Sequence, residues 1–306
     1  MRIGNRHITR SPKTFRPQLE ALEERWCPSV TVSTVPVFDG NLLKITGDSA
    51  ADVVNISDQG NGHIDVTDGD GNVLGSADDV TRVKIDTKGG SDVVHYTLVN
   101  QLTNSQAILV NLGSGDTNEA TFDFAPGVSD ANLFVSVDAA SGADTISATL
   151  GSLTAAHAGI FMYGGGGTDN LSVTAIGANI DEDSSLVVRL DGAGGDDSVV
   201  TTFSGQILGG LFVSAEGGRG ADTITSDITA DPGSTGRLLA LAAGGQGSDN
   251  VTLNVNDNSG DGGESTLERI HALIFDFDEV DTLVHTDNVD VITRLPRRFG
   301  HGRGFI

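Results

Sequence analysis

Cysteine, aromatic residues and long apolar runs are scarce or missing in this sequence. Its 306 residues include one cysteine, Cys27, and only 5% are aromatic. A single cysteine excludes an internal disulfide framework and a cysteine-based zinc site. No apolar run is long enough to span a bilayer, so we expect no transmembrane segment. The N-terminus also lacks the apolar core of a standard secretory signal.

Basic residues are few in the centre of the chain. The sequence has 42 Asp and Glu against 18 Lys and Arg, a net charge of −24. Residues 1–29 hold six basic and three acidic side chains, and residues 294–306 hold four basic and none acidic. The remainder therefore holds 39 acidic and 8 basic side chains, a net charge of −31. Such a field repels nucleic acid, which we exclude as a partner, and attracts divalent cations and basic partners.

Glycine is abundant and predicts many tight turns. The chain has 41 glycines, many of them in short runs. The apolar residues are mainly Val, Ile, Leu and Ala, and Thr is plentiful, which favours strands. No helical periodicity persists after residue 30. The sequence therefore predicts an all-β protein.

A repeat becomes visible when the chain is aligned on aspartates that follow glycine-rich turns. These are Asp52, Asp92, Asp144, Asp169, Asp197, Asp222, Asp249 and Asp281. Two residues after them come Val54, Val94, Ile146, Leu171, Val199, Ile224, Val251 and Leu283. Seven residues before them come Ile45, Ile85, Val137, Met162, Leu190, Ala215, Ala242 and Ile274. Nine residues before them come Leu43, Val83, Val135, Ile160, Val188, Val213, Ala240 and Ala272.

Every one of these positions is apolar in a chain that is 38% apolar, which indicates a register of buried side chains. The alternation predicts one strand before each turn and another after it. Glycine two residues before most of the aspartates predicts a backbone with positive φ there. The aspartate is expected to close the turn by accepting hydrogen bonds from nearby amides. A ninth, eroded copy runs through 108–112, Gly113–Asp116 and 121–124.

The spacing of the copies, near 26 residues, predicts a parallel β-solenoid of about nine coils. An antiparallel β-sandwich of repeated hairpins is the alternative. The longer interval after Asp52 predicts an extra hairpin around Asp68–Gly71. We expect a basic N-terminal arm at 1–36, one repetitive β domain at 37–293, and a basic tail at 294–306.

The N-terminal arm carries a recognisable motif. Residues 19–25 read Leu-Glu-Ala-Leu-Glu-Glu-Arg, with Pro28 and Ser29 following. This segment resembles the LEPR-XLL-like motif of large repetitive bacterial surface proteins, where it lies behind a basic stretch, as it does here. The sequence differs at Glu24, where the motif's name has proline. The resemblance implies export, and hence an extracellular or cell-surface location.

The repeats are similar to degenerate hemolysin-type (RTX-like) Gly/Asp repeats of bacterial surface and adhesin-like proteins. The glycine-rich turns at 165–169, 217–222 and 244–249 carry the likeness. RTX repeats bind calcium between consecutive turns of tandem nine-residue units. In this chain the turn occurs once per coil, so that tandem arrangement is missing.

Calcium is nevertheless the metal that a stack of coils favours. Stacked coils would place the turn aspartates in a column at about 4.8 Å spacing, where carboxylates repel by about 0.9 kcal/mol even in water. Bridging calcium would relieve that repulsion. The expected ligands are Asp92, Asp144, Asp169, Asp197, Asp222 and Asp249. The alternative is that each aspartate bonds the amides of its own turn and points away from the next.

A second acidic segment has the spacing of an EF-hand loop. Residues 257–262 read Asp-Asn-Ser-Gly-Asp-Gly, and Glu268 occupies the twelfth position. Gly263 and Glu264 do not fit the following loop positions, and no helices flank the segment. We interpret it as a coincidental polar loop.

The sequence assigns no catalytic residue and no cofactor besides calcium. It contains no G-x-S-x-G motif, P-loop or dinucleotide fingerprint, and its histidines never occur at metal-ligand spacing. We therefore expect a non-catalytic structural or adhesion protein with an acidic surface, whose partners are divalent cations and cell-envelope or extracellular-matrix components.

The alternative is a carbohydrate-active β-helix that binds or cleaves an acidic polysaccharide. A groove with exposed aromatic residues and Lys or Arg beside clustered Asp would favour it. The low aromatic content predicts that no such groove exists.

Overall fold

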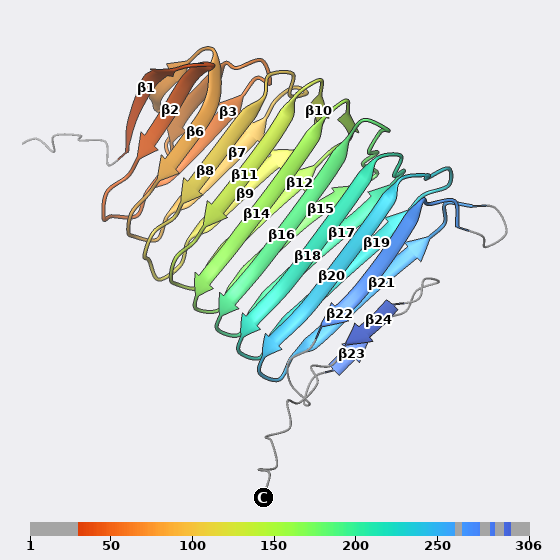
Figure 1. The fold of residues 1–306 in the computed structure, drawn as a ribbon. Coiled ribbons are helices and arrows are strands. Elements are labelled where there is room, and N and C mark those ends of the chain that lie inside the picture. The colour runs from red at the N-terminus through yellow and green to blue at the C-terminus, as the bar shows by residue number, and fades with distance from the viewer. Residues whose placement is uncertain (1–29, 261–264, 276–281, 285–290, 295–306) are drawn as a thin grey trace, which may run out of the picture.

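The protein is a stack of β-coils. The structure, a computed structural model, describes residues 30–260 and 265–275, and the backbone of Thr282–Val284 and Val291–Arg294. The chain advances steadily from one end of the stack to the other (Figure 1). These described parts contain strands and no helix, and hence no helix that could cross a membrane.

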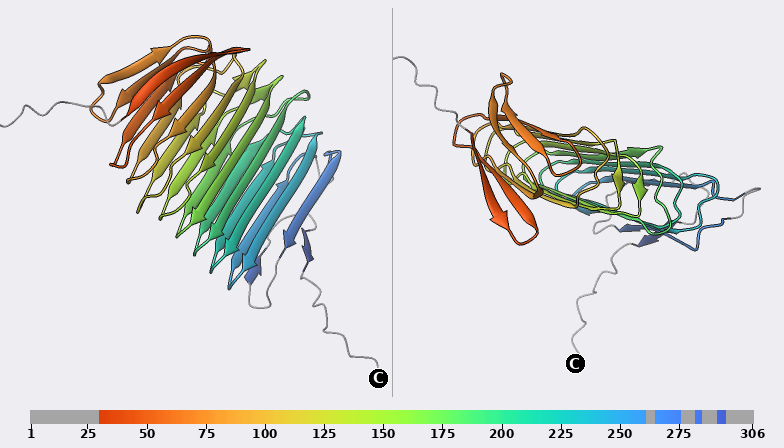
Figure 2. Two further views of the ribbon diagram at one scale, coloured as in Figure 1. Left: turned by 60° about the vertical axis from the view of Figure 1, so that its left-hand side comes forward. Right: turned by 90° about the horizontal axis from the view of Figure 1, so that it is seen from above.

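Two eleven-stranded sheets form the walls of the stack, and Figure 2 shows them as two facing layers. Sheet A contains, in spatial order, β1 (Thr31–Val37), β2 (Gly40–Thr46), β6 (Val80–Asp86), β8 (Gln106–Asn111), β11 (Asn132–Asp138), β14 (His157–Gly166), β16 (Ser185–Gly194), β18 (Gly210–Arg219), β20 (Arg237–Gln246), β22 (Arg269–Phe275) and β24 (Val291–Arg294). Sheet B contains β23 (Thr282–Val284), β21 (Asn250–Asp257), β19 (Thr223–Ala230), β17 (Ser198–Gly205), β15 (Asn170–Ile176), β12 (Thr145–Leu150), β9 (Glu119–Phe124), β7 (Val93–Leu98), β3 (Val53–Asp58), β4 (Ile64–Asp68) and β5 (Val73–Ala77).

Successive coils pair in parallel, which confirms the predicted β-solenoid and excludes the antiparallel sandwich. Each coil contributes one strand to sheet A and the next to sheet B, as β16 and β17 do. About seven complete turns, from β6–β7 to β20–β21, lie in the described residues, somewhat fewer than the nine predicted. The first coil, β2–β3, is followed by the inserted strands β4 and β5, and the coils after β21 are only partly described.

Antiparallel hairpins occupy the N-terminal end of the stack (Figure 2). Strand β1 pairs with β2, and β4 pairs with both β3 and β5. The turn at Asp68–Gly71 joins β4 to β5, which confirms the predicted extra hairpin. Strand β1 begins at Thr31, within the segment that the sequence assigned to the arm. These hairpins provide the end of a solenoid with a cap that differs from its repeats.

The core lies between the two sheets and follows the predicted register. Every aligned apolar side chain that the structure describes is buried, from Leu43 and Ile45 in β2 to Ala272 and Ile274 in β22. The side chain of Leu283 lies outside the described residues. A further column of buried residues forms bridges where the chain returns from sheet B to sheet A: Leu102, Val128, Leu153, Ile180 and Ile207.

The glycine-rich turns stack directly upon one another. Gly142, Gly167, Gly195 and Gly220 have φ between 133° and 136°, which confirms the predicted left-handed conformation. A Cβ added at Gly195 would lie 1.7 Å from the carbonyl oxygen of Gly167 in the coil before it. Only glycine therefore permits consecutive turns to approach at the sheet spacing.

Candidate functional site

The predicted metal ligands occupy one continuous column inside the fold. Each follows a glycine-rich turn and lies just before a strand of sheet B. Asp92, Asp144 and Asp169 are fully buried, and Asp197, Asp222 and Asp249 are 1–3% exposed. Asp281, the last aspartate of the alignment, lies outside the described residues.

Hydrogen bonds connect these side chains into what we call the aspartate ladder. In each rung, the backbone amide of one ladder residue donates to the side-chain Oδ1 of the ladder residue in the next coil, at 2.7–3.0 Å. The ladder runs through Asp52, Asp92, Asn118, Asp144, Asp169, Asp197, Asp222 and Asp249. From Asp92 onward, each ladder side chain thus accepts from the preceding coil, whereas the sequence predicted a bond within its own turn. Asp52, the first member, keeps the predicted bond, because its Oδ2 accepts a hydrogen bond from the Asp48 amide at 3.0 Å.

Asn118 is the ladder member that sequence reasoning missed. In the eroded copy the ladder residue comes eight positions after Val110, the last buried position of β8, whereas in other copies it comes seven positions after, as from Val137 to Asp144. The extra residue moved the alignment to Asp116. The coil length could have identified Asn118, because this residue lies 26 residues from both Asp92 and Asp144.

Burial of the ladder disfavours the ionised form of its carboxyl groups. The Oδ2 atoms of Asp92, Asp144, Asp169, Asp197 and Asp222 are buried and have no hydrogen-bond partner. Desolvation raises the pKa of Asp144, Asp197 and Asp222 to about 6, and the charges of neighbouring ladder aspartates add to the rise. The pKa values of Asp92 and Asp169 are raised for the same main reason. Protonation therefore offers the column a way to relieve its repulsion.

The ladder geometry bears on the calcium hypothesis without deciding it. One oxygen of each carboxylate already accepts a backbone hydrogen bond, and the other lies in the protein interior. Among the described residues, no group of three or more His, Cys, Asp or Glu side chains is arranged to hold a metal ion. Calcium binding by Asp92, Asp144, Asp169, Asp197, Asp222 and Asp249 stays a prediction.

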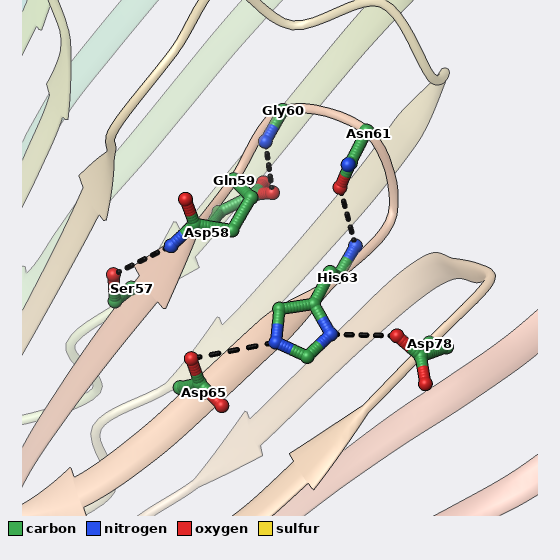
Figure 3. A network of polar contacts seen from close by, with 8 residues as sticks. All are labelled: Ser57, Asp58, Gln59, Gly60, Asn61, His63, Asp65 and Asp78. Carbon is green, nitrogen blue, oxygen red and sulfur yellow. Dashed lines mark hydrogen bonds and ion pairs between the residues drawn. The ribbon is translucent and has the colours of Figure 1, made fainter.

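A histidine between two carboxylates lies beside the inserted hairpin (Figure 3). The Nδ1 atom of His63 lies 2.6 Å from an Asp78 oxygen, and Nε2 lies 3.5 Å from Asp65. The hydrogen bond to Asp78 is the main reason that the pKa of His63 is raised. Neighbouring residues stabilise the turn before β4, since the Asn61 side-chain oxygen accepts a hydrogen bond from the His63 amide. We assign this cluster a role in shaping the hairpin.

The segment with EF-hand spacing is partly described. Asp261, Gly262 and Glu264 lie outside the described residues. Glu268 forms a two-point ion pair with Arg237, at 2.7 and 3.0 Å. Asp257 accepts a hydrogen bond from the Ser259 amide at 2.9 Å. The twelfth position of the loop is thus engaged with a neighbouring coil.

The two outer faces of the solenoid differ in chemistry. All eight basic residues of the segment 37–293 lie on sheet A or in the turns that follow its strands: Lys44, Arg82, Lys84, Lys88, Arg189, Arg219, Arg237 and Arg269. Sheet B instead directs mainly Ser, Thr and Asn outward, as Thr145, Ser147 and Thr149 do in β12. Most exposed aromatic residues of the regular coils also belong to sheet A, among them Phe134 and Tyr163.

Parallel register assembles a mixed polar and aromatic surface on the outside of sheet A. Tyr163, Asp191 and Glu216 lie side by side in β14, β16 and β18. Phe161, Arg189 and Ser214 form the adjoining row on the same three strands. The Ser214 hydroxyl donates to Glu216 at 3.2 Å. Partial burial and the charge of Glu216 raise the pKa of Asp191.

Two packing details shape this surface. The ring of Phe161 lies across Gly159, where an added Cβ would approach it to 2.9 Å, and meets Phe134 with ring centroids 5.2 Å apart. The guanidinium of Arg189 lies 5.2 Å from the ring centroid of Phe212, a cation–π contact. Arg189 forms no ion pair with any carboxylate in the described part of the chain.

The result is a pair of adjoining open hollows, which we call the sheet A trough. One hollow of about 350 Å³ is lined by residues that include Phe161, Tyr163, Arg189, Asp191 and Glu216. The other, of about 610 Å³, shares Asp191 and Glu216 and extends to Arg219 and Gln246. A low aromatic content therefore did not prevent a hollow that combines aromatic, basic and acidic residues, although its acids are one Asp and one Glu and not the clustered Asp of the expectation. Composition gives only the number of aromatic residues, whereas the strand register determines which of them lie next to one another.

No protein-family model, curated protein or solved structure gives a significant match to this chain.

Proposed function

We propose that the protein is a non-catalytic scaffold of the cell exterior that binds an envelope or matrix component through the outer face of sheet A. The observation that carries the proposal is the difference between the two outer faces. The basic residues of the repeat domain lie on sheet A or in the turns after its strands, and the trough lies on sheet A, whereas sheet B directs mainly Ser, Thr and Asn outward. This difference between the two faces supports sheet A as the binding side.

The interior supports a scaffold role. The aspartate ladder, the stacked glycine turns and the apolar register connect each coil to its neighbours, so the sheets extend as one stack. A stack of this kind presents the trough on strands rather than on loops, which keeps its side chains in fixed relative positions. The proposed location outside the cell rests on the resemblance of residues 19–29 to the LEPR-XLL-like motif.

Blocking one face at a time tests this proposal. Cys27→Ser removes the native thiol, and Tyr163→Cys or Ile176→Cys then places a single thiol on sheet A or sheet B of the same coil. Both native side chains are exposed, at 44% and 70%. Each thiol is coupled to a bulky polyethylene glycol maleimide, and sedimentation measures binding to envelopes from the cells that make the protein. Mass spectrometry of the same cell fractions locates the native protein.

We expect the polymer on sheet A to weaken envelope binding at least tenfold and the polymer on sheet B to leave it within twofold. The native protein should be recovered from the envelope or the medium. Equal binding by the two conjugates, or recovery from the cytoplasm alone, would contradict the proposal.

A further inference from the structure

We propose that the sheet A trough binds a neutral carbohydrate chain. This inference rests on the proposed function and names the chemistry of its ligand. The trough combines three groups that a sugar can satisfy together: an exposed aromatic ring at Tyr163, hydrogen-bond donors on Arg189, and acceptors on Asp191 and Glu216.

The charged side chains that line the trough balance one another, so it offers no net charge to an ionic ligand. Asp191 and Glu216 lie next to each other and form part of both hollows. Together with the net charge of −24, they repel an acidic polysaccharide. Arg189 in one hollow and Arg219 in the other balance these two carboxylates, so the trough itself has no net charge with which to hold a cationic chain. An uncharged ligand with many hydroxyl groups suits such a lining, since each hydroxyl can donate and accept a hydrogen bond.

The polar groups of the trough are available to such a ligand. The Arg189 guanidinium packs against the Phe212 ring, is exposed and is not paired with a described carboxylate, so its N–H groups are free to bond a ligand. Glu216 accepts one bond, from Ser214, and retains further acceptor capacity. A polar ligand is oriented in a pocket by fixed donors and acceptors that are not already hydrogen-bonded to each other.

Aromatic rings supply the apolar part of the site. The C–H groups on one face of a sugar ring carry slight positive charge, which matches the negative face of an aromatic ring. Tyr163 is 44% exposed and Phe134 is 41% exposed, and the latter packs against Phe161. Arg189 and Phe212 continue this surface across the next strands.

The trough has the length of a short chain of sugars. Its lining residues come from β11, β14, β16, β18 and β20, which are consecutive neighbours in sheet A. Four strand spacings amount to about 19 Å. The two hollows, at about 350 and 610 Å³, fall in the size range of ligand sites. A linear oligosaccharide along the solenoid axis would contact both.

Titration with defined hexasaccharides tests the inference on the full chain. The neutral probes are cellohexaose, maltohexaose, mannohexaose, laminarihexaose and N-acetylated chitohexaose, and the charged probes are oligogalacturonate and chitosan hexamers. Calorimetry gives the Kd, and chromatography afterwards shows whether the sugar is intact. We expect at least one neutral hexamer to bind at least tenfold more tightly than either charged one, and every sugar to remain uncleaved.

Tyr163→Ala should weaken that binding at least tenfold, and Glu216→Gln should weaken it measurably. The matched control is Ile176→Ala, on sheet B of the same coil, which should leave the Kd within twofold. Thermal unfolding of each variant verifies that the fold persists. Absence of neutral binding at millimolar concentration, preference for a charged probe, or unchanged binding by Tyr163→Ala would overturn the inference.

Failure here can be told apart from failure of the proposed function. If the polymer on sheet A blocks envelope binding while no neutral hexamer binds, the face functions in binding and its ligand is not a neutral sugar. If neither measurement depends on sheet A, the proposed function fails as well. Cleavage of a hexamer would contradict the non-catalytic part of the proposed function.

Discussion

Each aspartate of the ladder stabilises the fold through a hydrogen bond and destabilises it through its buried negative charge. Each buried carboxylate accepts the amide of the preceding coil, and a buried amide without a partner would cost about 1–3 kcal/mol. The same carboxylates lie close to one another in the protein interior, where their negative charges are unfavourable. Asn118 indicates that the hydrogen bond alone is sufficient, because its neutral amide oxygen occupies the same position in the ladder.

We expect the protein to lose stability between pH 5 and pH 7.5. The folded pKa values of Asp144, Asp197 and Asp222 are near 6, above the ordinary value of 3.8. A raised folded pKa contributes stability that is fully present below pH 3.8 and is lost as the pH rises through 6. Each pKa unit corresponds to about 1.4 kcal/mol, so each group contributes on the order of 3 kcal/mol at low pH, about half of which is lost between pH 5 and pH 7.5. Thermal unfolding at the two pH values measures the loss.

The matched control for this pH dependence is Asp197→Asn. The variant keeps an oxygen for the Asp169 amide and removes a titrating group, as Asn118 does naturally. Its melting temperature should fall less than that of the native protein over the same pH interval. A native melting temperature that is constant or rises from pH 5 to pH 7.5 would contradict the prediction.

At the scale of elements, the glycine-rich turn determines how closely two coils can stack. The turn joins sheet A to sheet B in every regular coil, and its backbone lies directly over the turn of the preceding coil. Gly195 has φ 134°, and the carbonyl of Gly167 occupies the space that a side chain would need. Neighbouring Gly194 is different, because the nearest atom to an added Cβ is 3.7 Å away and its φ is ordinary.

Gly195→Ala should destabilise the protein by at least about 2 kcal/mol, since positive φ alone costs on the order of 1–3 kcal/mol for an L residue. Gly194→Ala should change the stability by about 0.5 kcal/mol or less, because the methyl group meets no atom closely. Denaturant unfolding of both variants under identical conditions measures the difference. Similar stabilities of the two variants would show that the turns do not stack as described.

At the scale of the whole molecule, repetition converts small features of one coil into continuous surfaces. The ladder crosses the stack from Asp52 to Asp249, and the trough crosses neighbouring strands of sheet A. Neither feature exists in an isolated coil, because each needs the residues of the coils beside it. A polymer or a row of ions would therefore bind to several coils at once and not to a single coil.

The calcium hypothesis makes a prediction at this scale. If the ladder column binds calcium, titration of the metal-free protein should release or absorb heat and should raise the melting temperature through preferential binding to the folded state. Asp169→Asn, which removes one carboxylate while keeping the ladder bond, should weaken the effect. Neither heat nor a shift in melting temperature at millimolar calcium would contradict calcium binding.

The sequence alone determined the coil length and the core and favoured the solenoid, while the parallel pairing of the strands excluded the antiparallel sandwich. Alternation of apolar residues and a glycine before each aspartate are local signals, and they repeat often enough to establish a register. Val54, Ile85 and Met162 could be placed in the core because period-two patterning has one buried face. The one-residue insertion before Asn118 shifted the alignment to Asp116. A local pattern does not show which backbone amide a side chain will bond, so it could not correct the shift.

Only the tertiary structure decided the partners of the aspartates and the existence of the trough. Parallel stacking places the Oδ1 of Asp197 on the amide of Asp169, 28 residues earlier, and not within its own turn. It also places Tyr163, Asp191 and Glu216 side by side, although they lie 25 or more residues apart in the chain. Both outcomes depend on coil lengths of 25 to 28 residues in neighbouring copies, whose cumulative register determines which side chains become neighbours across the sheet.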